Sequence, residues 1–543
     1  MKLWLTILFV TACGGGPRTG LGPLRYHNAD PVTAVNDRVP IEPPGKFDKG
    51  LVEYYVKEDL IEPARDALTI DATRRAENIN SLGEVPDSAW FTNRRPTPEQ
   101  IRKGPGRGEP DRSAPWRVVG VKVGGAAIGI TIEDAQNQKF VLKFDEKGHA
   151  ETESSADVIV QRLTWAMGYN VPENDVVTFE REMLVLDPKA EVKFRSGDKR
   201  PMTQTDLETY LGMAEKQGTS FRALASQLIG GKILGGVDPS GTRKGDANDR
   251  VPHELRRDLR GQRLLWAWVN HIDIKSQNSL AAYTDEKYVK WYALDFGDSL
   301  GVNARTTGRN RLGYHTSYSM KDYLRSLVTF GLRVEPWERS VTYPELRGVG
   351  KFESKYFDPK DWKPAHNWQP ADAADRFDEL WAAELLMRFS RQHIEAAVAA
   401  GSYSDPHAAA YVVQILLERQ RKIGRYAFNR IAPLTQLEAR ANGGTLDVCF
   451  DDLWLRYAYG QRAGTAYRTR VFDYDGKVVA ERGQWQPADA AHTCMTSLPL
   501  AASNEQYTIV EIELRRDGNV KAPVFVHVAH GPNGLRVIGI DRR

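Results

Sequence analysis

From Arg117 onward, short runs of β-branched and aromatic residues alternate with glycines and polar turns, a pattern typical of a β-sheet. The first runs that predict strands are RVVGVKVGG, IGITIEDA and KFVLKFD, at 117–125, 128–135 and 139–145. Apolar residues then recur every three or four positions, which predicts a helix from about Thr152 to Met167, closed by Gly168. The strand pattern returns in NVPENDVVTF and REMLVLD, so this region is predicted to be a sheet with one helix.

Beyond Gln204 the spacing of apolar residues is mainly that of helices. The predicted elements are an amphipathic stretch at 253–271, a hairpin at 279–298, and two long helices at about 375–400 and 406–431. Gly401 suits the position after the end of the first long helix, and Asp405 suits the N-cap of the second. This region is therefore predicted to be a mostly helical lobe that contains one hairpin.

The last hundred residues change character again. TLDVCFDDLWLRYAY, YRTRVFDYDGKVV, EQYTIVEIELRRDG and APVFVHVAHG alternate apolar and polar residues at strand spacing, which predicts a small β-sandwich. Before residue 117 the pattern is weaker, although Trp90 and Phe91 are expected to dock on the main body.

The chain is therefore predicted to be α+β, with a two-lobed domain followed by a small all-β domain. The predicted segments are a signal peptide at 1–12, a flexible membrane tether at 13–44, an N-terminal extension packed on the core at 45–116, a sheet-rich N-lobe at 117–205, a mostly helical C-lobe at 206–432 and a β-sandwich-like domain at 433–543. The tether is placed where Gly and Pro are frequent and periodicity is absent.

Composition narrows the possible functions. Hydrophobic residues make up 41% of the 543 residues and charged residues 27%, as in an ordinary globular protein. The net charge is only +3, and no basic block is long enough to indicate nucleic-acid binding. The eleven histidines include no H-E-x-x-H pair, and there is no G-x-S-x-G motif of an esterase.

The first residues have the features of a secretory signal: a cation at Lys2, an apolar run over 3–10, and small residues up to Cys13. The run is too short to span a bilayer. The sequence Val-Thr-Ala-Cys ending at Cys13 resembles the bacterial lipobox, which implies that Cys13 carries acyl chains after cleavage. The residue after Cys13 is Gly14 and not an acidic residue, which in lipoproteins of this type favours the outer membrane. The protein is therefore expected in the cell envelope, anchored by lipid to the outer membrane.

Two cysteines remain once Cys13 is assigned to lipid, and both lie in the predicted β-sandwich. An exported protein is in a compartment that permits disulfides, so Cys449 and Cys494 are predicted to form one. Two separate buried thiols would have the same sequence, and that alternative stays open.

The stretch HIDIKSQN, residues 271–278, follows the amphipathic helix and precedes the hairpin that ends in LDFGD. The residues His271, Asp273, Lys275 and Asn278, followed by Asp295-Phe296-Gly297, resemble the H-x-D-x-K-x-x-N catalytic loop and the D-F-G motif of protein kinases. Either motif alone is weak, but the two occur in the right order and are joined by one hairpin. Without that resemblance, Asp273 and Asn278 would be a helix cap and a turn.

The resemblance implies a role for each of these residues. Phosphoryl transfer needs a carboxylate near the attacking oxygen and metal ligands that neutralise the phosphates. Asp273 would orient or deprotonate the acceptor and Lys275 would neutralise the transferring phosphate. The metal ligands would be Asn278 and Asp295, and the implied cofactors are ATP, or another nucleotide, and Mg²⁺.

A kinase also needs a lysine on the third strand and a glutamate on the following helix. Lys143 in FVLKF matches the lysine, although a solvent-facing strand lysine would look similar. The candidates for the glutamate are Glu151 and Glu153. Steps of three and four residues from Glu153 reach Ala156, Val160, Leu163 and Met167, an apolar stripe, whereas steps from Glu151 reach a mixed face. Because a carboxylate at the end of a buried stripe needs a partner, Glu153 is predicted to pair with Lys143.

The glycines Gly124, Gly125 and Gly129 lie between two strands, as a phosphate-covering loop does, but GGAAIG is not G-x-G-x-x-G. A plain β-turn explains them equally well. Lys143 is only ten residues before Glu153, and no A-P-E follows Gly297. With these departures, the chain resembles an atypical bacterial branch of the protein-kinase-like superfamily. The resemblance covers about residues 117–431.

Three functions are consistent with these patterns. The first is an envelope phosphotransferase that transfers a nucleotide γ-phosphate to a protein, sugar or lipid hydroxyl. The second is a pseudokinase that binds or scaffolds without catalysis. The third is an attachment protein that acts through the C-terminal β domain. The expected partners are the membrane, through Cys13, the nucleotide and an undefined acceptor.

Overall fold

The computed structural model describes residues 25–47, 51–62, 64–65, 74–106, 108–122, 129–194, 197–309, 312–316, 320–335, 338, 341–502 and 507–543. The described chain forms two compact units. The β unit consists of residues 25–31, 81–83 and 431–543, and the larger unit consists of residues 32–80 and 84–430. The signal peptide, Cys13 and the glycines Gly124 and Gly125 lie outside the described residues.

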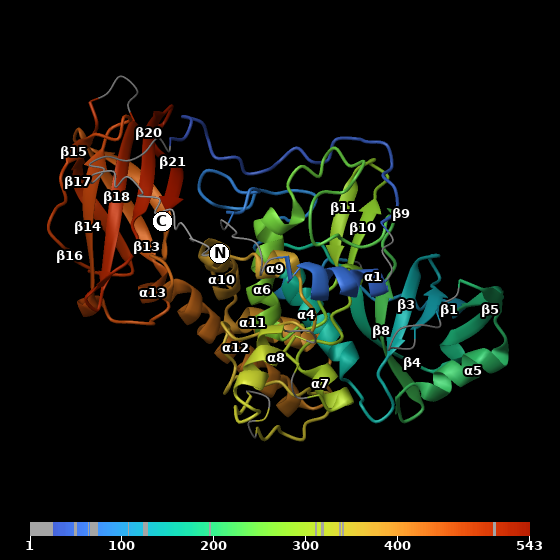
Figure 1. Cartoon of the computed structure of the whole chain (residues 1–543). Coiled ribbons are helices and arrows are strands. Elements are labelled where there is room, and N and C mark those ends of the chain that lie inside the picture. Colours follow the sequence, from blue (N-terminus) through green and yellow to red (C-terminus); the bar gives the residue numbers. More distant parts are fainter. Residues whose placement is uncertain are drawn as a thin grey trace, which may run out of the picture. The chain divides into compact units, whose positions relative to one another are not determined.

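The N-lobe of the larger unit is built on an eight-stranded sheet (Figure 1). Its strands are β1 (Trp116–Lys122), β2 (Gly129–Glu133), β3 (Lys139–Phe144), β4 (Asn174–Phe179), β5 (Leu184–Lys193), β6 (Lys199–Pro201), β7 (Lys216–Gln217) and β8 (Ser220–Gln227). The order is β4-β8-β3-β2-β1-β5-β6, with β7 paired to β8, and all pairs are antiparallel except β1 with β5. Alternate residues of β2 and β3, such as Ile132 and Phe140, enter the core, as period-two patterning requires.

The sheet continues past residue 205, the predicted end of the N-lobe. Strand β8 pairs with both β3 and β4, so the chain of the N-lobe runs to Gln227. Helix α5 (Gln204–Met213) precedes β8 and buries Leu207 and Leu211 in the same core. Helical periodicity after Gln204 therefore marks one helix of the N-lobe and not the start of the C-lobe.

Helix α4 (Glu153–Met167) occupies the position predicted for it and is buried on almost every side. It ends at Gly168, whose φ of 121° is accessible only to glycine at low cost. It packs against β4, against α3 (Pro98–Lys103) and against α11 (Arg391–Ala400). Such a helix can carry polar side chains only where each has a partner, which matters for the site described below.

The C-lobe is mainly helical, as predicted, with one small sheet. Its elements are β9 (Lys232–Ile233), η3 (His253–Leu255), α6 (Arg257–Val269), η4 (Ser276–Asn278), β10 (Ser279–Tyr283), β11 (Val289–Ala293), α7 (Val302–Thr307), α8 (Met320–Val328), α9 (Gln369–Asp372), α10 (Arg376–Met387), α11 and α12 (Pro406–Asn429). Helix α6 lies in the centre, and its Trp268 donates from Nε1 to the Leu416 carbonyl of α12 at 2.8 Å. The hairpin β10–β11 follows α6 as expected.

The helix predicted over 375–400 is two helices. Ser390 accepts a hydrogen bond from His393 N in a capping box, so a new helix, α11, starts there. At the break, the Phe389 carbonyl accepts from Gln420 Nε2, and the Leu386 carbonyl accepts from the same group in addition to Phe389 N.

Gly401 also differs from its prediction. Its φ is −70°, and the left-handed residue is the next one, Ser402. A Cβ at Gly401 would lie 2.7 Å from the Ile159 side chain, so glycine is required here by close packing on α4.

The N-terminal extension is part of the larger unit, apart from residues 81–83. Trp90 stacks on Trp291 of β11 at 3.9 Å between ring centroids, and Phe91 is completely buried. Asp37 accepts from Ala89 N through both carboxylate oxygens. Within the predicted tether, residues 32–44 thus join the larger unit.

Helix α1 (Leu51–Tyr55) continues into the π-helix η1 (Val56–Ile61), which buries Glu58 and Asp59 against the C-lobe. Asp59 accepts from Asn367 N at 3.0 Å and lies 3.2 Å from His366 Nδ1. Tyr55 packs its ring on His366. This segment is therefore part of the larger unit, and it returns in the description of the site.

The β unit contains two sheets that share one core (Figure 1). One sheet has the order β12-β13-β17, and the other β15-β14-β18-β20-β21 with β16 and β19 at its margins. The strands are β12 (Leu434–Asn442), β13 (Thr445–Asp452), β14 (Thr465–Phe472), β15 (Val478–Ala480), β16 (Gln486–Pro487), β17 (His492–Pro499), β18 (Tyr507–Arg516), β19 (Asn519–Val520), β20 (Val524–Gly531) and β21 (Gly534–Arg542), with α13 (Leu453–Arg456) after β13. Val448 and Phe450 of the first sheet pack with Val510 and Val526 of the second, which is the predicted sandwich arrangement.

Residues 25–31, also within the predicted tether, are bound to the β unit. Tyr26 donates from its hydroxyl to the Ile540 carbonyl, and its ring fills the space where Gly539 has no side chain. A disulfide links Cys449 and Cys494. Among the residues that the structure describes, no helix combines the length and the apolar character needed to cross a bilayer.

The predicted α+β class is confirmed, with a separate antiparallel β domain towards the C-terminus.

Candidate active site

The loop that carries the predicted catalytic residues begins where α6 ends. Asn270 adopts a left-handed conformation with φ 51° and caps the helix, so the chain turns sharply away. His271 then enters the core, where its Nδ1 lies 3.0 Å from Ser299 Oγ and its ring contacts Trp266 and Phe296. Burial lowers the pKa of His271 to about 4, so the imidazole is neutral at pH 7 and positions the loop.

Asp273, Lys275 and Asn278 lie together on this loop. Lys275 Nζ lies 2.8 Å and 2.6 Å from the two carboxylate oxygens of Asp273. Asn278 Nδ2 donates to Asp273 Oδ2 at 3.0 Å and to the Asp273 carbonyl at 2.8 Å. Burial lowers the pKa of Lys275, but the adjacent Asp273 carboxylate outweighs this and raises it. The three side chains form one network around the Asp273 carboxylate.

The hairpin returns the chain to this network. Strands β10 and β11 pair antiparallel with Ser279 opposite Ala293, and Leu294 N donates to the Asn278 carbonyl at 3.2 Å. Asp295 therefore follows directly beside Asn278. It has φ 66°, a left-handed conformation that costs energy for a non-glycine residue and is common at functional sites.

Lys143 comes to the same place from the N-lobe. It lies opposite Gly129 in the β2–β3 pair, and its Nζ is 2.7 Å from Asp295 Oδ1. The side chains of Lys143 and Asp295 are 30% and 45% exposed. Dehydration is nevertheless the largest influence on both pKa values, so the pair is partly screened from water although both side chains reach solvent.

The charges of this pair stabilise each other. Burial lowers the pKa of Lys143, but the carboxylates of Asp295, Asp157 and Glu153 together raise it. Burial raises the pKa of Asp295, but Lys143 outweighs it and the net change is downward. At pH 7 Asp295 is an anion and Lys143 a cation.

Glu153, predicted to be the partner of Lys143, lies near the lysine, but the ion pair that the structure shows is with Asp295. Burial, reinforced by Asp298, Asp145 and Glu146, raises the pKa of Glu153 to about 8, so Glu153 is mostly protonated at pH 7. Glu151, the other candidate, has φ 64° and is bound elsewhere, to Arg347 and Gln217.

Asp157, one turn beyond Glu153, was not among the predicted site residues. Its carboxylate is 1% exposed, accepts from Phe296 N at 3.2 Å and accepts from Asn174 Nδ2 at 2.6 Å. It thus joins α4 directly to the D-F-G segment. The sequence carried a signal for it, because an aspartate within the otherwise apolar run ADVIV needs a buried partner.

Asp298 is a second site residue that the motif comparison missed. Burial, reinforced by the negative charges of Asp273 and Asp295, raises its pKa to about 6, which places it within their electrostatic reach. Asn303 Nδ2 donates to its Oδ1 at 2.9 Å. Its signal in the sequence was its position directly after Asp295-Phe296-Gly297.

The N-terminal helix segment lies near Asp273 of this loop. Burial and the adjacent Glu58 and Asp59 raise the pKa of Tyr54, and the Asp273 charge adds to the rise. Tyr54 Oη donates to the Asn367 carbonyl at 3.5 Å. Tyr54, in the 51–62 segment, is therefore close enough to the 271–278 loop for the two to interact electrostatically.

The oxygen atoms of this site suit a divalent cation that prefers oxygen ligands. Asn278 uses Nδ2 for its hydrogen bonds, so its Oδ1 is available, and Asp295 uses only Oδ1 for Lys143. Carboxylate and amide oxygens are the ligands that Mg²⁺ and Mn²⁺ accept. The crowded carboxylates Asp295 and Asp298 would also be relieved of mutual repulsion by such an ion.

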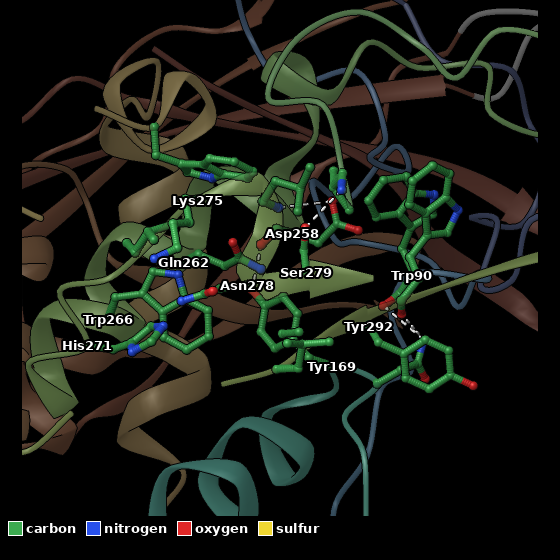
Figure 2. A pocket seen from close by; sticks show the side chains of 18 of the residues that line it. Trp90, Tyr169, Asp258, Gln262, Trp266, His271, Lys275, Asn278, Ser279 and Tyr292 are labelled. Carbon is green, nitrogen blue, oxygen red and sulfur yellow. Dashed lines mark hydrogen bonds between the residues drawn. The ribbon is translucent and has the colours of Figure 1, made fainter. Parts of the chain in front are cut away.

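A separate cavity of about 50 Å³ lies beside the loop and is lined by His271, Lys275, Asn278 and several aromatic rings (Figure 2). Figure 2 shows His271 and Lys275 on one side of it and Trp90 on the other. The cavity is too small for a nucleotide, but it can hold a few water molecules. Trp266 Nε1 and Trp368 Nε1 line it and have no acceptor among the described residues, so water is their expected partner.

The predicted glycine loop is only partly covered. Gly129 starts β2, where a Cβ would lie 3.3 Å from Val141 Cγ1. Gly124 and Gly125 are outside the described residues.

The larger unit thus brings Lys143 and Asp295 together with the 271–278 loop. No protein-family model matches this chain, and no curated protein sequence is significantly similar to it. Among solved structures, the chain is similar to the Helicobacter pylori proinflammatory kinase CtkA, with 12% identity and a TM-score of 0.29, over 57% of this chain and 94% of CtkA.

It is also similar to the Golgi casein kinase, with 9% identity and a TM-score of 0.26, over 58% of this chain and 72% of the kinase. A structure of the Golgi casein kinase with Mn/ADP bound gives 11% identity and a TM-score of 0.21, over 58% of this chain and 75% of that one. At these values the similarity identifies neither a substrate nor an activity.

Proposed function

We propose that this protein is a phosphotransferase that moves the γ-phosphate of a nucleotide, ATP in the first instance, to a hydroxyl group of a protein, sugar or lipid. The observation that carries the proposal is the meeting of Lys143 with Asp295 beside the Asp273–Lys275–Asn278 network. A cation from the sheet, two carboxylates and an amide oxygen close together are what phosphate positioning and metal-assisted transfer require.

Each side chain has a defined task in this proposal. Lys143 would bind the phosphates of the nucleotide, which compete with Asp295 for its ammonium group. Asp295 and Asn278 would hold Mg²⁺, with Asp298 as a further oxygen donor, and the ion would neutralise phosphate charge.

The remaining charges serve the acceptor side. Asp273 would accept the proton of the acceptor hydroxyl, while Lys275, now paired with Asp273, would stabilise the charge of the transferring phosphoryl group. Asp157 would keep the Phe296 backbone, and hence Asp295, in position.

The first experiment measures thermal unfolding of the protein from Gly14 onward, with and without MgATP. A ligand at about one hundred times its Kd adds roughly 2.7 kcal/mol to the folded state, a readable shift. We expect the shift only when the metal is present, and we expect it to vanish in Asp295→Ala. Asp361→Ala, which removes an exposed carboxylate of the same lobe, is the matched control and should shift like the wild type.

Transfer is tested separately from binding. Labelled γ-phosphate should appear on envelope components with wild-type protein and not with Asp273→Asn, although both should bind MgATP. Binding without transfer to any component would favour a pseudokinase scaffold. Absence of binding would direct attention to the β unit, whose deletion after Leu434 would then abolish the cellular role.

We further propose that Cys13 is lipidated and that the protein is anchored in the bacterial cell envelope, at the outer membrane. The support is the apolar run followed by Val-Thr-Ala-Cys and Gly14. Metabolic labelling with a fatty acid tests this. Wild type should carry the label and fractionate with outer membranes, whereas Cys13→Ser should carry none.

A further inference from the structure

One face of the small sheet in the β unit gathers four residues with ligand chemistry. Strands β13 and β17 pair antiparallel, with Cys449 opposite Cys494 and Asp451 opposite His492. Side chains two residues apart on a strand point to the same face. Cys-x-Asp on one strand and His-x-Cys on the next therefore form a two-by-two group on one face.

The distances within this group are short. Cys449 and Cys494 form the disulfide, and Cys494 Sγ lies 4.0 Å from His492 Nε2. The two sulfurs and a ring nitrogen of His492 all lie within 4.8 Å of one another. Ligands of a single tetrahedral Zn²⁺, with Zn–S near 2.3 Å and Zn–N near 2.0 Å, lie about 3.5–3.8 Å apart. The distance from Cys494 Sγ to His492 Nε2 is close to this range, whereas the two sulfurs must move apart once the disulfide is reduced.

His492 is already oriented as a metal-binding histidine is. Its Nδ1 is 2.8 Å from Asp451 Oδ1, while Arg456 Nη1 donates to the other oxygen, Oδ2, at 2.7 Å. A carboxylate on one ring nitrogen fixes the tautomer and leaves the lone pair of the other nitrogen for a metal. Here the other nitrogen is Nε2, the atom that lies near Cys494 Sγ.

Access to the group is from the histidine side. Cys449 is 2% exposed, Cys494 is half-buried, and the His492 side chain is 54% exposed. An ion arriving from solvent would meet His492 first and the buried thiolate of Cys449 last. Three protein ligands would leave the fourth tetrahedral position open to water.

We propose that Cys449, Cys494 and His492 form a redox-gated site for Zn²⁺, with Asp451 as the residue that orients His492. The disulfide and the metal exclude each other, because both use the two sulfurs. A dithiol supplies two electrons and two protons, becomes a disulfide itself, and converts Cys449–Cys494 into two thiols. Zn²⁺ then binds the two sulfurs as thiolates, and the two thiol protons pass to solvent.

Soft thiolate ligands with one imidazole favour Zn²⁺ over Mg²⁺, so this site is chemically distinct from the oxygen-rich cleft of the larger unit. The two sites would select different ions from the same solution. The proposal is independent of phosphotransferase activity, and either can fail without the other.

The test uses the protein from Gly14 onward, reduced with a phosphine. The phosphine takes an oxygen atom from water, whose two protons complete the thiols. Co²⁺ is then added as a spectroscopic probe. We expect a thiolate-to-cobalt charge-transfer band and visible d–d bands that saturate at one equivalent and disappear when Zn²⁺ is added. The oxidised protein should give neither band.

The variants separate a built site from two adventitious thiols. His492→Gln should weaken Co²⁺ binding at least tenfold, and Asp451→Asn by about tenfold, the loss typical of an outer partner of a metal-binding histidine. His530→Gln, at an exposed histidine of the same unit, should bind as the wild type does.

Three results would overturn the proposal. One is a reduced, folded protein, judged by circular dichroism, that gives no thiolate band. Another is His492→Gln with wild-type affinity, which would leave only a dithiol. The third applies if reduction unfolds the β unit. The proposal then requires Zn²⁺ to restore the fold, and a β unit that stays unfolded with Zn²⁺ present would overturn it.

Discussion

Asp157 is the most informative residue to change in the larger unit, because it joins α4 to the D-F-G segment. Asp157→Ala would leave two buried donors, Phe296 N and Asn174 Nδ2, without their acceptor. Each unsatisfied buried donor costs about 1–3 kcal/mol, so the predicted loss of stability is about 2–6 kcal/mol. Asp157→Asn retains one amide oxygen and can keep one of the two bonds, so its predicted loss is about half as large.

The effect on the site follows from the position of Phe296, the residue next to Asp295. Once Phe296 N has no acceptor, Asp295 loses its fixed position relative to Lys143 and Asn278. We expect the Kd of MgATP to rise at least tenfold in Asp157→Ala and less in Asp157→Asn. Isothermal titration at a temperature where each variant is folded measures the Kd, and urea unfolding measures the stability.

A general loss of stability must be separated from a local effect. Asp452 of the β unit is a comparable control, because its buried carboxylate accepts from Trp454 N and from Tyr467 Oη, both at 2.9 Å. Asp452→Asn should destabilise the protein without changing the Kd. If folded Asp157→Ala bound MgATP as tightly as the wild type, the idea that Asp157 positions Asp295 would be refuted.

Three further predictions concern other parts of the chain. Lys143→Met should abolish the MgATP-dependent thermal shift, and a normal shift would exclude Lys143 from nucleotide binding. Burial lowers the pKa of His527 from 6.5 to about 4. The free energy of unfolding is therefore unaffected by this group above pH 6.5, and it falls by about 3 kcal/mol as the pH drops from 6.5 to 4, because the unfolded chain takes up the proton first. Hydrogen exchange of β20 amides should show this loss, and His527→Phe should remove that part of the pH dependence. Gly401→Ala should cost about 1–3 kcal/mol in urea unfolding because of the contact with Ile159, whereas Gly212→Ala, where a Cβ meets nothing within 4 Å, should be neutral or stabilising.

Local patterns predicted the elements well where one physical signal dominated. The apolar stripe and Gly168 predicted α4, and strand alternation predicted the sandwich. The break at Ser390 was missed because the apolar spacing continues across it. The capping box of Ser390 starts the new helix, and Gln420, far along the chain, bonds the Leu386 and Phe389 carbonyls at the break. Apolar spacing reveals neither interaction.

The sequence predicted that the residues of the 271–278 loop and Asp295 lie together, but it did not predict the contact that Asp157 of α4 makes with Phe296. Order and spacing were enough to bring Asp273, Asn278 and Asp295 into one group, since a short hairpin joins them. Choosing Glu153 relied on helix periodicity, which states which face a residue occupies but not what lies opposite. Asp157 is on a neighbouring position of the same helix, and only the path of the D-F-G backbone shows that its carboxylate has a partner there.

The docking of the 51–62 segment has a consequence for when the protein becomes complete. Asp59 binds His366 and Asn367, which follow it by 307 and 308 residues. At a synthesis rate of about 5–20 residues per second, the segment would wait roughly 15–60 s for its partners. The 271–278 loop thus acquires its N-terminal neighbour only after Asn367 has been synthesised. Before that point a nascent chain cannot hold the 51–62 segment in place beside the loop, because the backbone donor for Asp59 does not yet exist.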